Sequence, residues 1–353
     1  MKLLILTQKV DSEDDVLGFM HHWIEELAKR CQTIVVICLW QGRHNLPANV
    51  RVLSLGKEKE HSKIKHLYRF YRYIWQERKH YDIVFVHMNK EYVVLGGLWW
   101  RLLNKKIALW YNHRQGNLWS WVAGWLSHKI FYTSSFSFFA RSGFKKAQIM
   151  PAGIDTEIFK RQEGAVAAPN SIFSLGRIAP VKNIETLIEA AKFLDKKNLN
   201  FIINIGGEAG EKDKEYFARI KKLAQELEIR GKVNFLGKIS HNLAPVFYNQ
   251  NELFVNLTNA GSLDKTTMEA MACERLVLVS NAAFNYIFPD DLRDRLIFQE
   301  KNSSDLSEKL FWLTGLNQVE REVIGRRLRA VVIEKHSLER LAARLLEIFN
   351  SLN

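Results

Sequence analysis

The chain has 353 residues, of which 47% are hydrophobic and 25% charged, and it carries a formal net charge of +13. This length predicts about two domains, and the composition excludes a disordered chain, a collagen-like repeat and a low-complexity protein. Its three cysteines are too few for a disulfide scaffold and match no zinc-binding spacing, which is typical of a reduced, cytoplasmic environment.

The positive charge is concentrated in the first half of the chain. Residues 1–168 contain 25 lysines and arginines against 14 acidic residues, whereas the remainder contains 26 against 24. This asymmetry favours an anionic partner for the first half, with a solvated basic surface as the alternative. No apolar stretch of the sequence approaches the roughly 18 residues of a membrane-spanning helix. The apolar start, Met1–Thr7, is expected to be a buried strand rather than a signal peptide.

Short apolar runs alternate with amphipathic segments over most of the chain. A helix is expected at residues 19–30, and the segment 306–350 is helix-like throughout. Such alternation predicts βαβ units and parallel sheets covered by helices on both faces. The strands are expected at residues 3–6, 34–39, 83–86, 107–111, 130–132, 172–175, 201–205, 233–236, 253–257 and 276–279.

The pattern breaks after Pro151, and the polar segment 160–170 is the expected linker. The sequence therefore predicts an α/β protein with two doubly wound domains, residues 1–165 and 166–336, and a helix at about 337–353 that packs back on the first domain. Two such domains would face a cleft, and ligands are expected beyond the carboxyl ends of the strands.

The loop after the strand at 172–175 carries two cations. Gly176 permits a tight turn, Arg177 and Lys182 follow, and a helix is expected near Asn183. This position suits a diphosphate, because arginine can hold phosphate oxygens with two donors and lysine adds a point charge. The alternative is an exposed basic loop.

A second polar loop follows the strand at 253–257. It contains Gly261 and Lys265 and leads into a helix that carries Glu269. Backbone N–H groups of the loop and the helix start can bind an anion, and the Glu269 carboxylate can accept hydrogen bonds from a ribose diol. The alternative for Glu269 is a partly buried glutamate paired within the protein.

Two histidines follow strands of the first half. His113 comes after the strand at 107–111, and His87 ends the strand at 83–86. A histidine at such a position can donate a hydrogen bond or move a proton near neutral pH. A structural role is the alternative for each.

Five segments of the chain resemble the retaining glycosyltransferases of family 4, the glycosyl transferases group 1 type, which have the GT-B fold. The resemblance is specific over about 150–350 and looser over 1–150, and it implies two Rossmann-like domains with a helical C-terminal segment. The segments are Pro151–Phe159, Gly176–Lys182, Val233–Lys238, Met268–Cys273 and Lys335–Ala342.

This resemblance assigns roles to matching positions. Arg177 and Lys182 match a pair that binds the donor diphosphate, and Glu269 matches the second glutamate of a Glu-x7-Glu motif that contacts the nucleotide ribose. His113 matches a histidine near the transferred sugar, so His113, Arg177 and Lys182 are the expected catalytic residues. The other expected donor-binding residues are Gly18, Gly176, Gly207, Lys238, Ile239, Ser262, Leu263, Asp264 and Lys265, and those on the acceptor or sugar side are His87 and Gly116.

The sequence departs from the family pattern at two places. The first glutamate of the Glu-x7-Glu motif is replaced by Gly261, which leaves the donor sugar and the catalytic strength open. The N-terminal loop has one glycine, Gly18, where the family often has two. The acceptor side is therefore expected to differ from the family pattern.

The resemblance implies a retaining transfer of sugar from a nucleotide-sugar donor, such as a UDP- or GDP-sugar, to an acceptor. Cations and a helix start can stabilise the diphosphate leaving group without a metal, and we expect neither a metal nor a cofactor. His113 would position the sugar as a hydrogen-bond donor more than act as a general base.

The segment 57–79 contains eight basic residues against three acidic ones, with aromatic residues interleaved. A basic helix with aromatic side chains can lie on an anionic lipid surface. We therefore expect a peripheral protein on the inner face of the membrane and a glycan or lipid-linked acceptor. A solvated helix with a buried aromatic face is the alternative.

Three other functions stay open. Gly261 is compatible with a non-catalytic protein that binds nucleotide sugars, and GT-B relatives also include sugar-nucleotide epimerases and phosphorylases. The sequence shows neither the extra carboxylates of an epimerase nor the length of a phosphorylase. Nucleic acid is not an expected partner, because no known nucleic-acid-binding motif is present.

Overall fold

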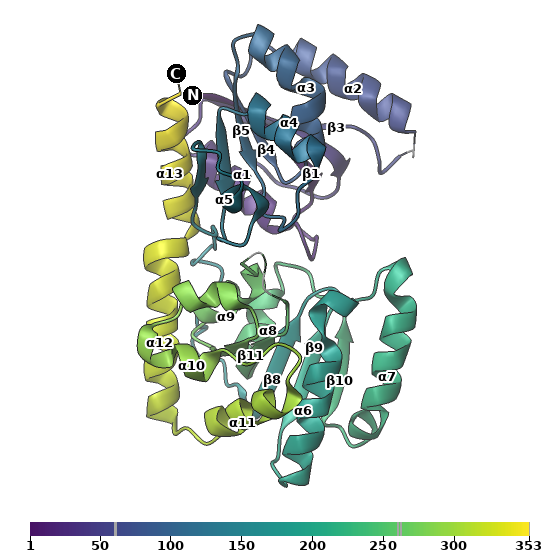
Figure 1. Ribbon diagram of the computed structural model, residues 1–353, viewed down its shortest axis with the longest axis vertical. Helices are drawn as coiled ribbons and strands as arrows, with labels where there is room; N and C mark the ends of the chain where they lie inside the picture. The colour runs from purple at the N-terminus through teal and green to yellow at the C-terminus, as the bar shows by residue number, and fades with distance from the viewer. Residues whose placement is uncertain (60–61, 260, 262, 353) are drawn as a thin grey trace. The chain divides into compact units, whose positions relative to one another are not determined.

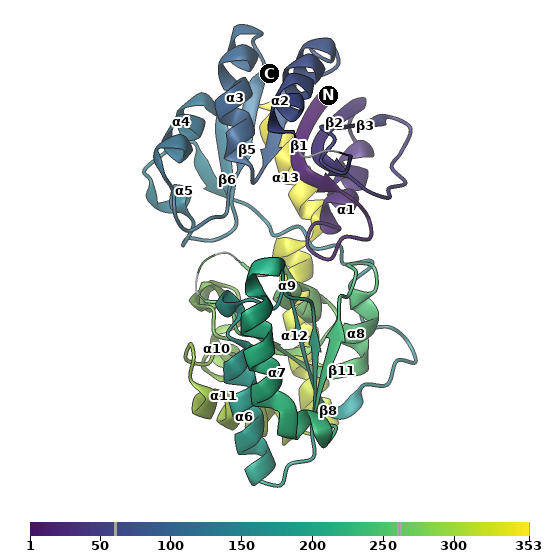
Figure 2. The same cartoon turned by 90° about the vertical axis from the view of Figure 1, so that its right-hand side faces the viewer.

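The computed structural model describes residues 1–59, 62–259, 261 and 263–352, and it divides the chain into two units. The first unit is Met1–Gly153 together with Leu338–Asn353, and the second is Ile154–Ser337 (Figures 1 and 2). None of the helices that the structure describes is long and apolar enough to cross a bilayer.

The first unit is built on a parallel sheet of seven strands in the order β3-β2-β1-β4-β5-β6-β7. Its central strands are apolar on both faces, as expected for a sheet that helices cover on both sides. The strands are β1 (Lys2–Val10), β2 (Thr33–Gln41), β3 (Val50–Ser54), β4 (Ile83–His87), β5 (Lys106–Trp110), β6 (Lys129–Tyr132) and β7 (Ala147–Ile149).

Helices cover both faces of this sheet. On one face, α1 (Phe19–Ala28) and the C-terminal helix α13 (Leu338–Asn350) pack side chains such as Trp23 and Phe349 against β4 and β5. On the other face lie α2 (Lys63–Gln76), α3 (Lys90–Leu102), α4 (Leu118–Leu126) and the short α5 (Phe138–Arg141). The last helix of the chain thus completes the core of the first unit.

The second unit has a parallel sheet of five strands in the order β10-β9-β8-β11-β12. Its strands are β8 (Ala168–Leu175), β9 (Ile202–Gly206), β10 (Val233–Gly237), β11 (Asn251–Asn256) and β12 (Leu276–Val279). The helices are α6 (Ile184–Lys196), α7 (Lys214–Ile229), α8 (Ala244–Gln250), α9 (Lys265–Ala272), α10 (Asp290–Leu296), α11 (Ser303–Thr314) and α12 (Gln318–His336).

The two parallel sheets confirm the predicted α/β class, and every strand expected from an apolar run is present. The sequence missed β3 and β7, and the helix-like segment 306–350 consists of three helices, α11 to α13. The units divide at Gly153, before the expected boundary at 165, because Ile154 pairs with Ser337 and Phe159 packs on Tyr248 in the second unit. Residues expected to be linker also enter β8, which begins at Ala168.

Candidate functional site at the carboxyl edge of the second sheet

Three loops of the second unit meet where β8, β9 and β10 end. The Gly176 N–H donates to the carbonyl of Gly206 at 3.1 Å, and the Gly207 N–H donates to the carbonyl of Gly237 at 2.7 Å. A Cβ atom on Gly207 would lie 2.0 Å from the Gly176 carbonyl oxygen, and Gly207 has a φ of +129°. Glycine is therefore required at position 207 for the loops to approach so closely.

The Lys182 ammonium lies within this group of loops. Its Nζ donates to Asp264 Oδ2 at 2.7 Å and to Thr258 Oγ1 at 3.0 Å. A Cβ atom on Gly176 would lie 3.2 Å from the same Nζ, so the glycine leaves room for it. An ammonium has three N–H donors. Asp264 and Thr258 take two of them, and the Lys182 side chain remains 22% exposed.

Asp264 is the N-cap of α9 and links this helix to Lys182. Its Oδ1 accepts from the Thr266 hydroxyl at 2.7 Å, and its Oδ2 accepts from Thr258 at 3.0 Å. Burial opposes ionisation of this carboxyl, but the adjacent ammonium and the hydrogen bonds hold the pKa of Asp264 well below its ordinary value. The Asp264 carboxylate is therefore ionised at neutral pH.

Lys265 begins α9, directly after Asp264. Burial lowers the pKa of Lys265 to about 7, although the nearby Glu269 carboxylate favours the charged form. An arriving anion would favour the ammonium further. Two neighbouring residues were also predicted to bind the donor. Leu263 is buried, and Ser262 lies outside the described residues.

Glu269 is buried within the second unit. The Tyr248 hydroxyl donates to its Oε2 at 3.0 Å, and His241 Nε2 lies 3.3 Å from its Oε1. The carboxylate is thus held in place by two protein groups. Each carboxylate oxygen can still accept a further hydrogen bond, so a ribose hydroxyl could share it.

The other donor-side residues differ in exposure. Arg177 is exposed, and its Nε lies 3.9 Å from Asp213 Oδ2. Lys238 is also exposed, whereas Ile239 is buried, with Cδ1 only 2.5 Å from where a Cβ of Gly206 would lie. Arg177 is therefore free to move to a ligand, and Ile239 supports the glycine turn.

His113 lies on the loop after β5 in the first unit. Its ring is exposed and stands 5.0 Å from the ring of Tyr111, edge to face. The Tyr111 hydroxyl donates to the Gln115 carbonyl at 3.2 Å and accepts from Lys90 at 3.3 Å, which fixes the loop. A Cβ atom on Gly116 would lie 2.3 Å from the Phe138 ring, so Gly116 serves packing there.

His87 and Gly18 have local structural explanations in the first unit. His87 is 4% exposed, and its ring packs against those of Phe19 and Trp23 at 5.7 and 5.8 Å. Gly18 is the N-cap of α1 with an ordinary helical backbone, φ −54°.

Within the described residues, one cluster has the geometry to hold a metal ion: His21, His22 and Glu25 on α1. His21 Nε2 accepts the backbone N–H of Asn45 at 3.1 Å, so its Nδ1 carries the proton of the neutral ring. That Nδ1 faces Glu25 Oε2 at 3.2 Å, and His22 Nδ1 faces it at 3.1 Å. This donor set fits hydrogen bonding within the helix better than metal binding.

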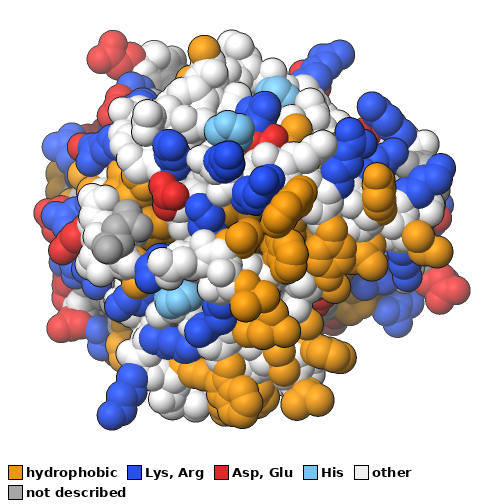
Figure 3. Space-filling view, turned by 90° about the horizontal axis from the view of Figure 1, so that it is seen from above, with side chains coloured by type: hydrophobic (Ala, Val, Ile, Leu, Met, Phe, Trp, Pro, Cys, Tyr) orange, Lys and Arg blue, Asp and Glu red, His pale blue; other side chains and the backbone are white. Residues whose placement is uncertain are grey.

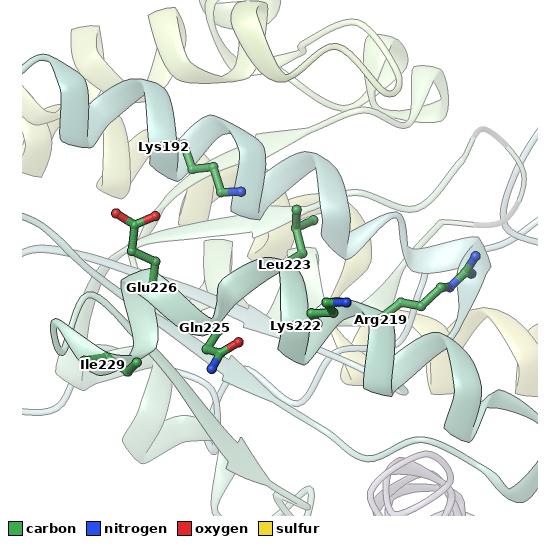
Figure 4. A pocket seen from close by; sticks show the side chains of 7 residues that line it. All are labelled: Lys192, Arg219, Lys222, Leu223, Gln225, Glu226 and Ile229. Atoms are coloured by element: carbon green, nitrogen blue, oxygen red, sulfur yellow. The ribbon is translucent and has the colours of Figure 1, made fainter.

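A groove of about 620 Å³ lies between α6 and α7 of the second unit (Figure 4). Lys192 lines it from α6, and Arg219, Lys222, Leu223, Gln225, Glu226 and Ile229 line it from α7. Its residues belong to helix surfaces, whereas the strand-end loops hold the charged pair and the glycine turns. The candidate site is therefore at the strand ends.

Sequence reasoning missed the groups that organise this site. It named Lys182, Asp264 and Glu269 but neither the pair between the first two nor the partners of the third, Tyr248 and His241. Thr258 is the one further residue with a sequence signal, since it directly follows the expected strand 253–257.

Part of the chain matches the model of a known family. Residues 155–327, just under half of the chain, match the model of the family described as glycosyl transferases group 1. The matched range contains Gly176, Lys182, Asp264 and Glu269 and excludes His113.

Two characterised relatives match about half of the chain. Poly(ribitol-phosphate) alpha-N-acetylglucosaminyltransferase of Staphylococcus aureus (strain COL) is 26% identical over 179 residues, 50% of this chain and 34% of that protein. Alpha-monoglucosyldiacylglycerol synthase of Streptococcus pneumoniae is 24% identical over 200 residues, 48% of this chain and 44% of that protein. The chain thus spans less than half the length of either relative.

The fold extends further than the sequence likeness. The Anabaena protein HepE, solved in complex with UDP and glucose, superposes with a TM-score of 0.79 at 15% identity, and the match covers 99% of this chain and 100% of that one. The chain has the GT-B fold.

Proposed function

We propose that this protein is a group 1 glycosyltransferase that moves a sugar from a nucleoside-diphosphate sugar to an acceptor. The observation that carries the proposal is the Lys182 ammonium, held by Asp264 and Thr258 beside the glycine turns at the strand ends. The family match over residues 155–327 supports it. Since HepE was solved with UDP and glucose, UDP-sugars are the first donors to test.

The reaction breaks the bond between the anomeric carbon and the diphosphate. Negative charge develops on the leaving diphosphate, and cations aimed at it stabilise the transition state. Lys182 offers its third N–H, Arg177 can reach from its exposed position, and the N-terminus of α9 adds a partial positive charge. These groups support transfer without a metal ion.

We further propose that transfer retains the anomeric configuration. The family resemblance of the strand-end segments is the support for this stereochemistry. In a front-face reaction the leaving phosphate accepts the acceptor proton, so Gly261 need not be a carboxylate for that step. His113 would then orient the sugar by hydrogen bonding.

The acceptor is proposed to be a glycan or a lipid at a membrane surface. One relative is named for transfer to poly(ribitol-phosphate), the other as a synthase of a glucosylated diacylglycerol. The basic, aromatic helix α2 of the first unit supports association with an anionic membrane surface.

The first experiment is a thermal-shift screen of nucleoside diphosphates and nucleotide sugars, since a ligand of the folded state raises the Tm. The expected result is a shift with one nucleotide that is lost in Lys182→Met and kept in Lys196→Met, a control on α6. No shift with any nucleotide contradicts the proposal. A nucleotide sugar that is converted without acceptor into another sugar nucleotide would instead identify an epimerase.

A further inference from the structure

The first unit contains a hollow of about 440 Å³ between α2 and α3, here called the α2–α3 hollow. Its lining comes from α2, α3 and the segments that end β2 and β3. The apolar residues that line it are Leu39, Leu55, Leu67, Phe70, Tyr92 and Leu95, and the basic ones are Lys57, Lys63 and His66. Its volume lies within the range of small-molecule sites.

Hydrogen bonds hold the walls of the hollow in position. Arg69 Nη1 donates to the Leu55 carbonyl at 2.8 Å, and Gly56, with φ +94°, lets the chain pass this guanidinium. The Tyr71 hydroxyl donates to the Leu95 carbonyl at 3.1 Å, joining α2 to α3. The hollow is thus a built feature of the unit rather than a gap between loose side chains.

The position of the hollow suits a substrate. Leu39 lies near the end of β2, and Leu55 directly follows β3. Ligands of parallel α/β sheets bind beyond the carboxyl ends of the strands. The hollow therefore stands at the ligand-binding edge of the first sheet.

Apolar side chains flank the hollow on the outer surface of the same helices. Ile64 and Tyr68 of α2 are 82% and 66% exposed, and Leu98 and Leu102 of α3 are 67% and 79% exposed. The face drawn in Figure 3 has hydrophobic side chains gathered together, with lysines and arginines beside them. Large exposed apolar patches mark interaction sites, and basic neighbours favour an anionic lipid surface.

We propose that the α2–α3 hollow binds an anionic amphiphile, with the hydrocarbon chain against Leu55, Phe70 and Tyr92 and the phosphate on Lys57 and Lys63. An apolar floor with a basic rim matches a lipid that joins a hydrocarbon chain to an anionic head group. This proposal rests on the proposed function in one respect, because it takes the sugar acceptor to be a lipid of this class.

The test measures binding of dodecyl phosphate below its critical micelle concentration to the full chain, by calorimetry and without nucleotide. Dodecyl phosphate is expected to bind the wild type, whereas inorganic phosphate and dodecanol bind at least tenfold more weakly. Leu67→Glu is expected to weaken binding at least tenfold, because it places a charge in the lining. Ile64→Glu, the same change on an exposed residue one turn away, is the control and should bind as the wild type does.

A second pair of variants tests the rim. Lys57→Gln/Lys63→Gln is expected to weaken dodecyl phosphate binding at least fivefold. The control Lys59→Gln/Lys65→Gln has the same change of charge and should bind dodecyl phosphate as the wild type does. Equal binding of inorganic phosphate, or equal losses in test and control variants, would overturn the proposal. The amphiphile is measured without nucleotide, so the two proposals can fail separately. If dodecyl phosphate binds but no nucleotide does, only the proposed function is refuted.

Discussion

A methyl group on Gly207 would lie 2.0 Å from the carbonyl oxygen of Gly176, much closer than two such atoms can approach. The loops after β8 and β9 are therefore in backbone-to-backbone contact. This contact fixes the backbone beside Lys182, the residue proposed to bind the donor diphosphate.

Replacing Gly207 by alanine should damage both stability and binding. The added methyl group meets the Gly176 carbonyl, and the φ of +129° is one that alanine rarely adopts. We expect the free energy of unfolding in urea to fall by at least about 2 kcal/mol. The control is Gly231→Ala, at φ +69° with open space around the added Cβ, which should cost about 1 kcal/mol. Equal losses in the two variants would contradict the close contact.

The pair between Lys182 and Asp264 allows structural and binding roles to be separated. Lys182→Met leaves the mostly buried Asp264 carboxylate without its ammonium and should lower the free energy of unfolding by about 3 kcal/mol. Lys182→Met/Asp264→Asn removes both charges and should recover most of this loss. Nucleoside diphosphate affinity should fall at least tenfold in both variants.

Titration calorimetry with the best nucleotide of the thermal-shift screen measures that affinity. Recovery of nucleotide binding together with stability in the double variant would show that Lys182 supports the fold and does not contact the diphosphate.

The lowered pKa of Lys265 predicts that the protein takes up a proton when a nucleoside diphosphate binds. Its pKa of about 7 leaves most of the free protein with a neutral Lys265 at pH 8. A bound diphosphate raises this pKa, so the complex takes up a proton, and affinity is highest below pH 7 and falls above it. The measurement is calorimetry at pH 8 in buffers of different ionisation enthalpy. At this pH the phosphates of the nucleotide are already ionised, because the second pKa of a phosphate is about 6. Lys265→Met should abolish the uptake; unchanged uptake in this variant would assign it elsewhere.

His113→Ala should affect transfer more than donor binding. The exposed ring lies on a loop that Tyr111 fixes through the Gln115 carbonyl, so its removal should leave the fold intact. We expect kcat to fall about a hundredfold, the lower end of the loss seen when one positioned hydrogen-bond donor is removed from a reacting centre. The nucleotide Kd should change less than twofold. His80→Ala, an exposed histidine of the same unit, is the control. Equal losses in kcat and affinity would indicate a structural histidine.

The basic residues of α2 predict binding to anionic vesicles. Lys63→Gln/Lys65→Gln/Arg72→Gln should weaken vesicle binding about a hundredfold at low salt, because each basic residue near the surface contributes about 1 kcal/mol. Arg69 is left unchanged because it supports the Leu55 carbonyl. A triple lysine-to-glutamine variant of the second unit at positions 192, 196 and 222 is the control. Vesicle flotation that does not differ between the two variants would remove the membrane proposal.

The sequence predicted the central strands because their apolar runs are continuous. It missed β3 because Arg51 interrupts the apolar run of Val50–Ser54. It missed β7 because this strand has only three residues. For the site, the sequence predicted individual residues but not which of their side chains contact one another. Lys182 and Asp264 are 82 residues apart, and no local pattern indicates that their side chains pair. Nor does any signal in the sequence connect Tyr248 to Glu269, because that contact depends on how α8 and α9 both pack on β11.

The return of α13 to the first unit has a consequence for how the protein is synthesised. All of the second unit, Ile154–Ser337, is synthesised before α13 is translated. The first sheet, made earliest, keeps the α13 side of its core open until Leu341, Leu345 and Phe349 arrive. Chaperones that recognise exposed apolar surface would therefore be expected to hold the N-terminal part of the nascent chain the longest.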